Sequence, residues 1–133
     1  MEITELQKHI LDFRDERDWA QFHNPKDLAA AIAIEAAELQ EKFLRLSTEA
    51  AQLKWQQDPE VADELADVIN NCLLFASSCN IDISSACLQK LEHNKAKYPV
   101  DKSKGSAKKY TEYQQDISCK IGEKWYELNK KIR

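Results

Sequence analysis

Residues 28–43 read LAAAIAIEAAELQEKF, and this stretch decides the fold. Up to Leu39 nearly every side chain in it is apolar, apart from Glu35 and Glu38. A helix that is apolar on almost all sides is usually buried, and residues three apart lie on one face of a helix. The stretch therefore predicts a long buried helix over residues 25–46 that carries two acidic side chains on one face.

A second stretch, EVADELADVINNCLLF at residues 60–75, repeats this spacing with Glu64 and Asp67. Carboxylates are rarely buried without a partner, and four that face one another would raise their own pKa values unless a cation lay between them. A hard divalent cation prefers oxygen ligands. The two acidic pairs therefore predict a metal site; the alternative is that they lie on solvated helix faces, where such pairs are common. The residues that share the two faces are Glu35, Glu38, Lys42 and Arg45 on the first helix, and Glu60, Glu64, Asp67 and Asn71 on the second.

Composition indicates one all-α domain. The chain has 133 residues with only 2 Gly and 3 Pro, so turns are few and long helices are expected. The net charge of -4 argues against nucleic acid as a partner. No apolar run is long enough to cross a membrane, and the charged start MEITELQKHI is unlike a secretory signal. The 4 cysteines form no CxxC pair, which favours a reducing cytoplasm over a disulfide framework.

Capping signals predict the other helix boundaries. Asn24 before Pro25, and Asp58 before Pro59, each combine a good N-cap residue with a proline at the first helical position. Asn80 is suited to ending a helix. The remaining expected features are an amphipathic helix from Ile3 through Phe13 toward Trp19, a break at residues 19–25, a short helix from Ser47 or Thr48 to Trp55, a helix from Ser84 or Ser85 to Lys97, and a C-terminal helix that opens with the capping box Thr111-Glu112-Tyr113-Gln114.

A basic face is predicted on the helix that ends at Lys97. Lys90, Asn94 and Lys97 are separated by four and three residues, so they share one side of it. Lysine binds phosphate as a point charge and the asparagine amide donates hydrogen bonds, but a solvated basic face has the same pattern. The next segment, YPVDKSKGSAKK at residues 98–109, is expected to be irregular, either as a linker or as a flap over an anion.

Several kinds of chemistry are excluded by missing patterns. The chain has neither a glycine-rich phosphate loop nor a readable Ser-His-Asp set. No histidine lies three residues from an acid of the two pairs, which argues against the Glu-x-x-His motif of di-iron bundles. Oxygen ligands alone favour Mg²⁺ or Mn²⁺ over Zn²⁺, and Mg²⁺ normally holds substrate phosphates as well. Phe13, Trp19 and Phe22 are either core residues or rings on which a base stacks.

The pattern Glu35-x-x-Glu38, followed by Glu64-x-x-Asp67, resembles that of the MazG-like nucleoside triphosphate pyrophosphohydrolases, and especially the subgroup that includes the dCTP pyrophosphatases. The resemblance extends from about Leu6 to Tyr113. The flanking segments that carry it are RDWAQFHNPKDL, KLEHNKAKYPV and KGSAKKY. The resemblance implies an all-α bundle of four core helices plus a C-terminal helix, assembled as a dimer or tetramer. It implies a MazG-like domain over residues 1–110 and a helical extension over 111–133.

The resemblance also implies an activity, which is Mg²⁺-dependent hydrolysis of a nucleoside triphosphate to monophosphate and pyrophosphate, with Mn²⁺ as a possible substitute. The expected substrate is a deoxynucleotide, and the expected role is removal of unwanted nucleotides. Glu35, Glu38, Glu64 and Asp67 become the catalytic metal ligands, and one of them, or Glu41, orients the attacking water. The residues expected to bind substrate are Trp19, His23, Asn71, Lys90, Asn94, Lys97 and Tyr98.

Two positions depart from the family pattern. Arg45 stands where an aromatic residue often follows the first acidic motif, and Asn71 stands where a tyrosine often follows the second. Base preference therefore cannot be carried over from the family. Two other functions stay open, a non-catalytic helical interaction module and a phosphohydrolase that releases orthophosphate.

Overall fold

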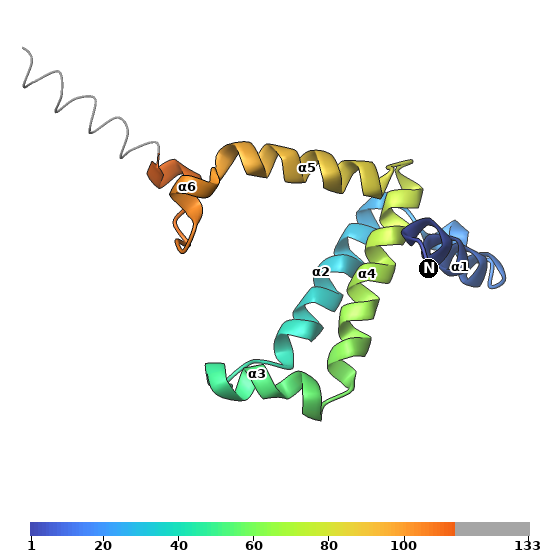
Figure 1. Ribbon diagram of the computed structural model, residues 1–133. Helices are drawn as coiled ribbons and strands as arrows, with labels where there is room; N and C mark the ends of the chain where they lie inside the picture. Colours follow the sequence, from blue (N-terminus) through green and yellow to red (C-terminus); the bar gives the residue numbers. More distant parts are fainter. Residues whose placement is uncertain (114–133) are drawn as a thin grey trace, which may run out of the picture. The chain divides into compact units, whose positions relative to one another are not determined.

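The computed structural model describes residues 1–113, and this part of the chain is helical without any strand (Figure 1). The predicted all-α class is confirmed. The elements are α1 (Ile3–Asp15), the 3₁₀ helix η1 (Trp19–Phe22), α2 (Pro25–Glu41), α3 (Thr48–Gln57), α4 (Glu60–Ser78), α5 (Ile83–Lys97) and α6 (Val100–Ser103). The described residues fall into two compact units, residues 1–86 and residues 87–113.

The first unit is built on α2 and α4, which lie side by side and antiparallel (Figure 1). Their contact is the most extensive between any two elements of the described chain, and α1 and α3 also pack against α4. Leu28 on α2 and Leu73 and Ala76 on α4 are the buried hydrophobic residues of the described part. The paired helices place the first acidic motif opposite the second.

Capping confirms several of the predicted boundaries. The side chain of Asn24 accepts a hydrogen bond of 3.0 Å from the backbone N–H of Asp27, with Pro25 as the first residue of α2. Ser47 caps α3 in the same way through Ala50. Asn80 ends α4 with a φ of 52°, a left-handed conformation that asparagine tolerates well.

Other predicted boundaries are wrong. The helix expected over residues 25–46 ends at Glu41, because the chain forms tight turns there and Arg45 adopts a φ of 66°. The cap of α5 is Asp82 instead of Ser84 or Ser85, since its carboxylate accepts hydrogen bonds from the backbone N–H of Ser85 at 3.1 Å and from its hydroxyl at 2.8 Å.

The basic segment at residues 98–109 is not wholly irregular, because α6 forms within it directly after Pro99. The helical turn expected from Thr111 starts earlier. There the backbone N–H of Lys109 donates to the Glu112 carboxylate at 3.2 Å, so Lys109 takes the place expected for Thr111. The remainder of the predicted C-terminal helix lies outside the described residues.

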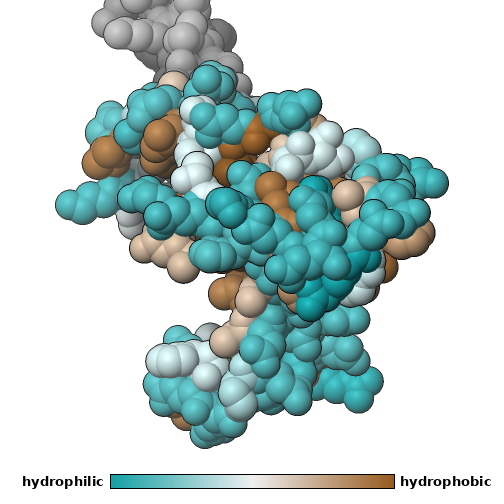
Figure 2. Space-filling model, turned by 90° about the vertical axis from the view of Figure 1, so that its right-hand side faces the viewer, coloured by the Kyte–Doolittle hydropathy of each residue, from teal (hydrophilic) through white to brown (hydrophobic). Residues whose placement is uncertain are grey.

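Apolar side chains remain exposed on the first unit. Ile34 on α2 is 57% exposed, and Leu65 on α4 is 50% exposed. Figure 2 shows hydrophobic surface between hydrophilic regions on the face that it presents. Such side chains leave apolar area available for a further contact. None of the helices within residues 1–113 is both long and apolar enough to cross a membrane.

Candidate active site

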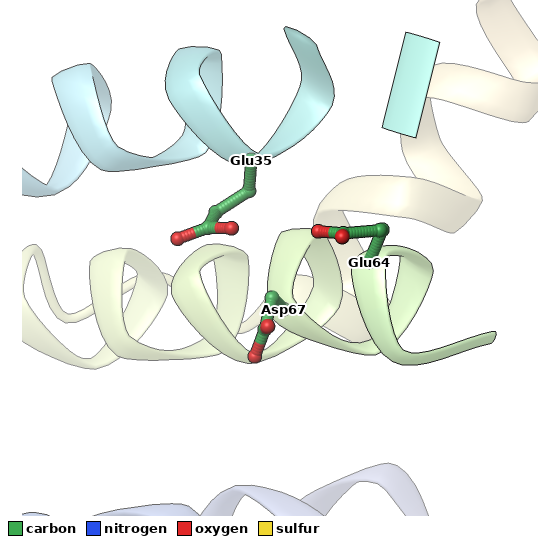
Figure 3. A group of neighbouring side chains, drawn as sticks. All are labelled: Glu35, Glu64 and Asp67. Carbon is green, nitrogen blue, oxygen red and sulfur yellow. The ribbon is translucent and has the colours of Figure 1, made fainter. Parts of the chain in front are cut away.

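Three acidic side chains of α2 and α4 lie close together. Glu35 extends from α2 toward α4, which carries Glu64 and Asp67 one turn apart (Figure 3). One carboxylate oxygen from each of the three lies within 4.8 Å of the others. The predicted meeting of the two motifs is therefore present for these three residues, which we call the acidic cluster.

Glu38 lies beside the acidic cluster. Its side chain is exposed, and its charge acts on Glu35. Burial raises the pKa of the Glu35 carboxyl above its ordinary value, and the neighbouring charges of Glu38, Asp67 and Glu64 raise it further. Carboxylates held this close repel one another, and a divalent cation that prefers oxygen ligands would relieve the repulsion. The donor set therefore fits a hard cation such as Mg²⁺.

Lys42 is a neighbour of the acidic cluster, and no role was predicted for it from the sequence. Its ammonium group contacts the Glu60 carboxylate and lies 3.5 Å from an oxygen of Glu64. Hydrogen bonding to Glu60 raises the pKa of Lys42, so the side chain is charged at neutral pH. The sequence did contain a signal for this contact. Lys42 follows Glu35 by seven residues and therefore lies on the same helix face.

A pocket of about 580 Å³ adjoins the acidic cluster and shares Asp67 with it. The pocket is formed by residues of α1, the η1 region and α4. Three residues that are expected to bind substrate line it, namely Trp19, His23 and Asn71. The other lining residues are Leu6, His9, Ile10, Phe13, Arg14, Asn70 and Leu74.

The contribution of α1 to this pocket was not predicted as part of the site. Gln7 donates a hydrogen bond of 3.0 Å to the Leu73 carbonyl and so ties α1 to α4. Phe13 packs edge-to-face on Trp19 at 5.8 Å, and the Arg17 guanidinium lies 3.7 Å from the Phe13 ring centre. The spacing of Ile10 and Phe13 indicated an apolar helix face, but it did not show which side of α4 this face contacts.

His23 presents an unused polar atom at the pocket. Its Nδ1 is buried and lacks a hydrogen-bond partner within the described part of the chain. Burial lowers the pKa of the imidazole, and the nearby charge of Arg14 lowers it further. A neutral imidazole can donate or accept a hydrogen bond, so His23 is suited to contact a polar edge of a ligand.

The other predicted substrate residues belong to the second unit. The Lys97 ammonium lies 4.9 Å from the centre of the Tyr110 ring, and Tyr98 contacts the same ring edge-to-face at 6.0 Å. Asn94 is half-buried and Lys90 is exposed. The aromatic contacts link the end of α5 to the segment after α6. A phosphate-binding role for these four residues stays a prediction.

Comparison with known proteins gives a consistent set of relatives. The model of the MazG-like family matches residues 30–113. The chain is 35% identical to dCTP pyrophosphatase 1 from Rattus norvegicus and 33% identical to that from Homo sapiens, in each case over 113 residues and 83% of this chain. It spans 66% of the length of these two relatives. A solved pyrophosphatase from Archaeoglobus fulgidus is 36% identical, with a TM-score of 0.69, over 73% of this chain and 92% of that protein.

Proposed function

The chain belongs to the MazG-like family, and on that premise we propose that it hydrolyses nucleoside triphosphates to monophosphate and pyrophosphate in a Mg²⁺-dependent reaction. The observation that carries the proposal is the convergence of Glu35, Glu64 and Asp67 beside a pocket that includes Asp67. The names of the relatives favour a deoxynucleoside triphosphate, and such an enzyme would remove unwanted nucleotides from the cellular pool.

In the proposed mechanism the acidic cluster holds the metal, and Glu38 completes the acidic face next to Glu35. Bound Mg²⁺, or Mn²⁺ in its place, would neutralise phosphate oxygens and lower the pKa of a water. A carboxylate of this group, or Glu41, orients the attacking water and accepts its proton. The carboxylates therefore serve both to bind cation and to move a proton.

The pocket is the proposed site for the nucleoside. The exposed Trp19 ring offers a stacking surface, and the buried Nδ1 of His23 offers a hydrogen bond. Asn71 adds an amide on the α4 side, although its Nδ2 already donates 3.0 Å to the Asp67 carbonyl. We assign Lys90, Asn94, Lys97 and Tyr98 to the triphosphate, because cationic and amide donors suit phosphate oxygens.

A panel of nucleoside triphosphates incubated with Mg²⁺ and the purified protein tests the activity. Release of pyrophosphate together with the monophosphate supports the proposal. Release of orthophosphate instead would identify a different phosphohydrolase. A folded protein that releases neither product from any triphosphate would favour the non-catalytic interaction module.

Trp19→Ala tests the nucleoside pocket. Loss of a stacked base costs about 1–3 kcal/mol, so we expect KM for the best substrate to rise by roughly 5- to 150-fold while kcat changes less. Trp55→Ala is the matched control, because Trp55 is an exposed tryptophan of α3 that does not line the pocket. Equal effects of both variants on KM would remove Trp19 from the binding site.

We also propose that a second copy of this chain covers the exposed apolar side chains of α2 and α4. Support comes from Ile34 on α2 and from Leu65 and Ile69 on α4, which are 57%, 50% and 43% exposed. Leu65 and Ile69 share one face of α4 because they are four residues apart. The helices that carry the acidic cluster would then also form the interface, as a dimer or within a tetramer.

Ile34→Asp tests this interface. A carboxylate placed in an apolar contact would have to lose its hydration, so we expect the variant to dissociate to the monomer at a concentration where the unchanged protein is assembled. Light scattering coupled to gel filtration measures the mass of each species. Val100→Asp is the control, since Val100 is exposed but lies outside α2 and α4. A monomeric unchanged protein at micromolar concentration would contradict the proposal.

We propose a reducing cytoplasm as the location of the enzyme. Cys72, Cys79 and Cys87 are free thiols in the described part of the chain, which supports this setting. Cys72 and Cys79 are half-buried on α4 and at its end, where a small apolar side chain suits the packing.

A further inference from the structure

Lys42 lies at the end of α2 between two acidic side chains of α4. Its ammonium contacts the Glu60 carboxylate and lies 3.5 Å from Glu64 Oε1. The Lys42 and Glu64 side chains are 21% and 19% exposed, whereas that of Glu60 is 66% exposed. Lys42 therefore links a solvent-exposed carboxylate to a half-buried carboxylate of the acidic cluster.

This lysine is the single basic side chain that the described residues place in an ion pair with a member of the acidic cluster. Its charge offsets part of the repulsion among the three carboxylates. A metal ion bound by the Glu64 carboxylate would be repelled by the ammonium group. The attraction of Lys42 for Glu64 and the binding of metal at Glu64 therefore oppose each other.

We propose that Lys42 is a positioning residue that acts as an internal counter-cation. It neutralises part of the acidic cluster when metal is absent and lowers the affinity of the cluster for a divalent cation. Glu60 limits this competition, because it is the stronger partner of Lys42 and restrains the ammonium group away from the centre of the cluster. The inference rests on the proposed metal-dependent function and assigns that site a residue that tunes its metal affinity.

Lys42→Met keeps most of the side-chain volume and removes the charge. At low ionic strength we expect it to bind Mn²⁺ about three- to tenfold more tightly than the unchanged protein, because one repulsive charge near a divalent ion is lost. Titration of Mn²⁺ alone, followed by calorimetry, measures the affinity without any substrate. The gain should shrink as salt is added, since salt screens charges but not packing.

Two variants control for charge and fold. Lys8→Met removes one positive charge and one ion pair, with Asp12, from the exposed face of α1, and should leave Mn²⁺ affinity within about twofold. Lys42→Arg keeps the charge and should restore the unchanged affinity. Melting followed by circular dichroism without metal should show a folded Lys42→Met protein with a lower Tm, because its carboxylates have lost their counter-cation.

Glu60→Gln tests whether Glu60 restrains the Lys42 ammonium group. It leaves Glu64 as the remaining carboxylate contact of Lys42 and should weaken Mn²⁺ binding. Lys42→Met should then give a larger gain in affinity when added to Glu60→Gln than when added to the unchanged protein, as a double-mutant cycle would show. An equal or smaller gain would overturn the role of Glu60.

The result that overturns the central inference is a Lys42→Met protein that is folded and binds Mn²⁺ no more tightly than the unchanged protein. Weaker binding would mean that Lys42 holds Glu64 in place for the metal. If the proposed metal-dependent function is wrong, the unchanged protein itself binds no Mn²⁺. Lys42 then has no metal ion with which to compete. The two failures are thus separated by the first titration.

Discussion

Replacing Glu35 by glutamine is expected to lower kcat/KM for the best triphosphate by more than about a hundredfold. Substitution of groups that only support metal ligands typically costs 10- to 100-fold, and a ligand should cost more. Glu35 is the one member of the acidic cluster that α2 contributes, so its loss leaves only two carboxylates of α4. Steady-state hydrolysis at saturating Mg²⁺ measures the change.

The same variant should stay folded without metal. The pKa of Glu35 is raised in the folded protein, so the folded state binds more protons than the unfolded chain between the ordinary pKa and the raised one. The contribution of Glu35 to stability is therefore present at low pH and is lost as the pH rises through the raised pKa. Glutamine cannot ionise, so at pH 7 the metal-free variant should melt at or above the temperature of the unchanged protein.

Bound Mg²⁺ should affect the Tm of the unchanged protein and of Glu35→Gln differently. Mg²⁺ that binds the native state must raise the Tm of the unchanged protein, and this rise should be smaller in Glu35→Gln. Asp63→Asn is the matched control, because Asp63 precedes Glu64 on α4 but does not belong to the acidic cluster. Full activity and a full Mg²⁺ response in Glu35→Gln would show that the cluster is not the metal site.

Leu73→Ala is expected to destabilise the protein by about 2–5 kcal/mol, the range for a leucine truncated in a packed core. Leu73 is 2% exposed on α4, and its carbonyl accepts the hydrogen bond from Gln7 of α1. The described part of the chain has few such fully buried side chains, so little other packing can compensate for the cavity.

Urea unfolding at a fixed protein concentration measures this loss, because assembly makes stability depend on concentration. Leu88→Ala makes the same truncation on α5 at a leucine that is 64% exposed, and it should change the free energy of unfolding by less than about 1 kcal/mol. Similar losses for the two variants would contradict the view that Leu73 anchors the core.

Local sequence signals predicted most of the helices because their causes are local. Asn24 and Pro25, Ser47 and Asn80 act on backbone groups within a few residues. The sequence did not predict the early end of α2. Arg45 adopts a left-handed conformation there, and this conformation is usually marked by a glycine. The cap at Asp82 was missed although aspartate is a favoured N-cap residue, since two serines nearby offered an equally good signal.

The site was predictable to the extent that helical spacing decides it. The two acidic motifs each define a face, and the packing of α2 against α4 makes the faces meet. Spacing does not show which side chains fill the space around them. The contacts of Lys42 with Glu60 and Glu64 join two helices separated by a turn and by α3, so they depend on how α2 and α4 are aligned. The part of α1 in the pocket depends in the same way on tertiary packing.

The position of Asp67 has a thermodynamic consequence. Its carboxylate belongs to the acidic cluster and also lines the pocket, so a cation and a nucleoside that occupy these places share one side chain. Whatever factor the cation applies to the affinity for the nucleoside, the nucleoside must apply equally to the affinity for the cation. Discrimination among bases would then extend to how firmly each substrate retains its metal.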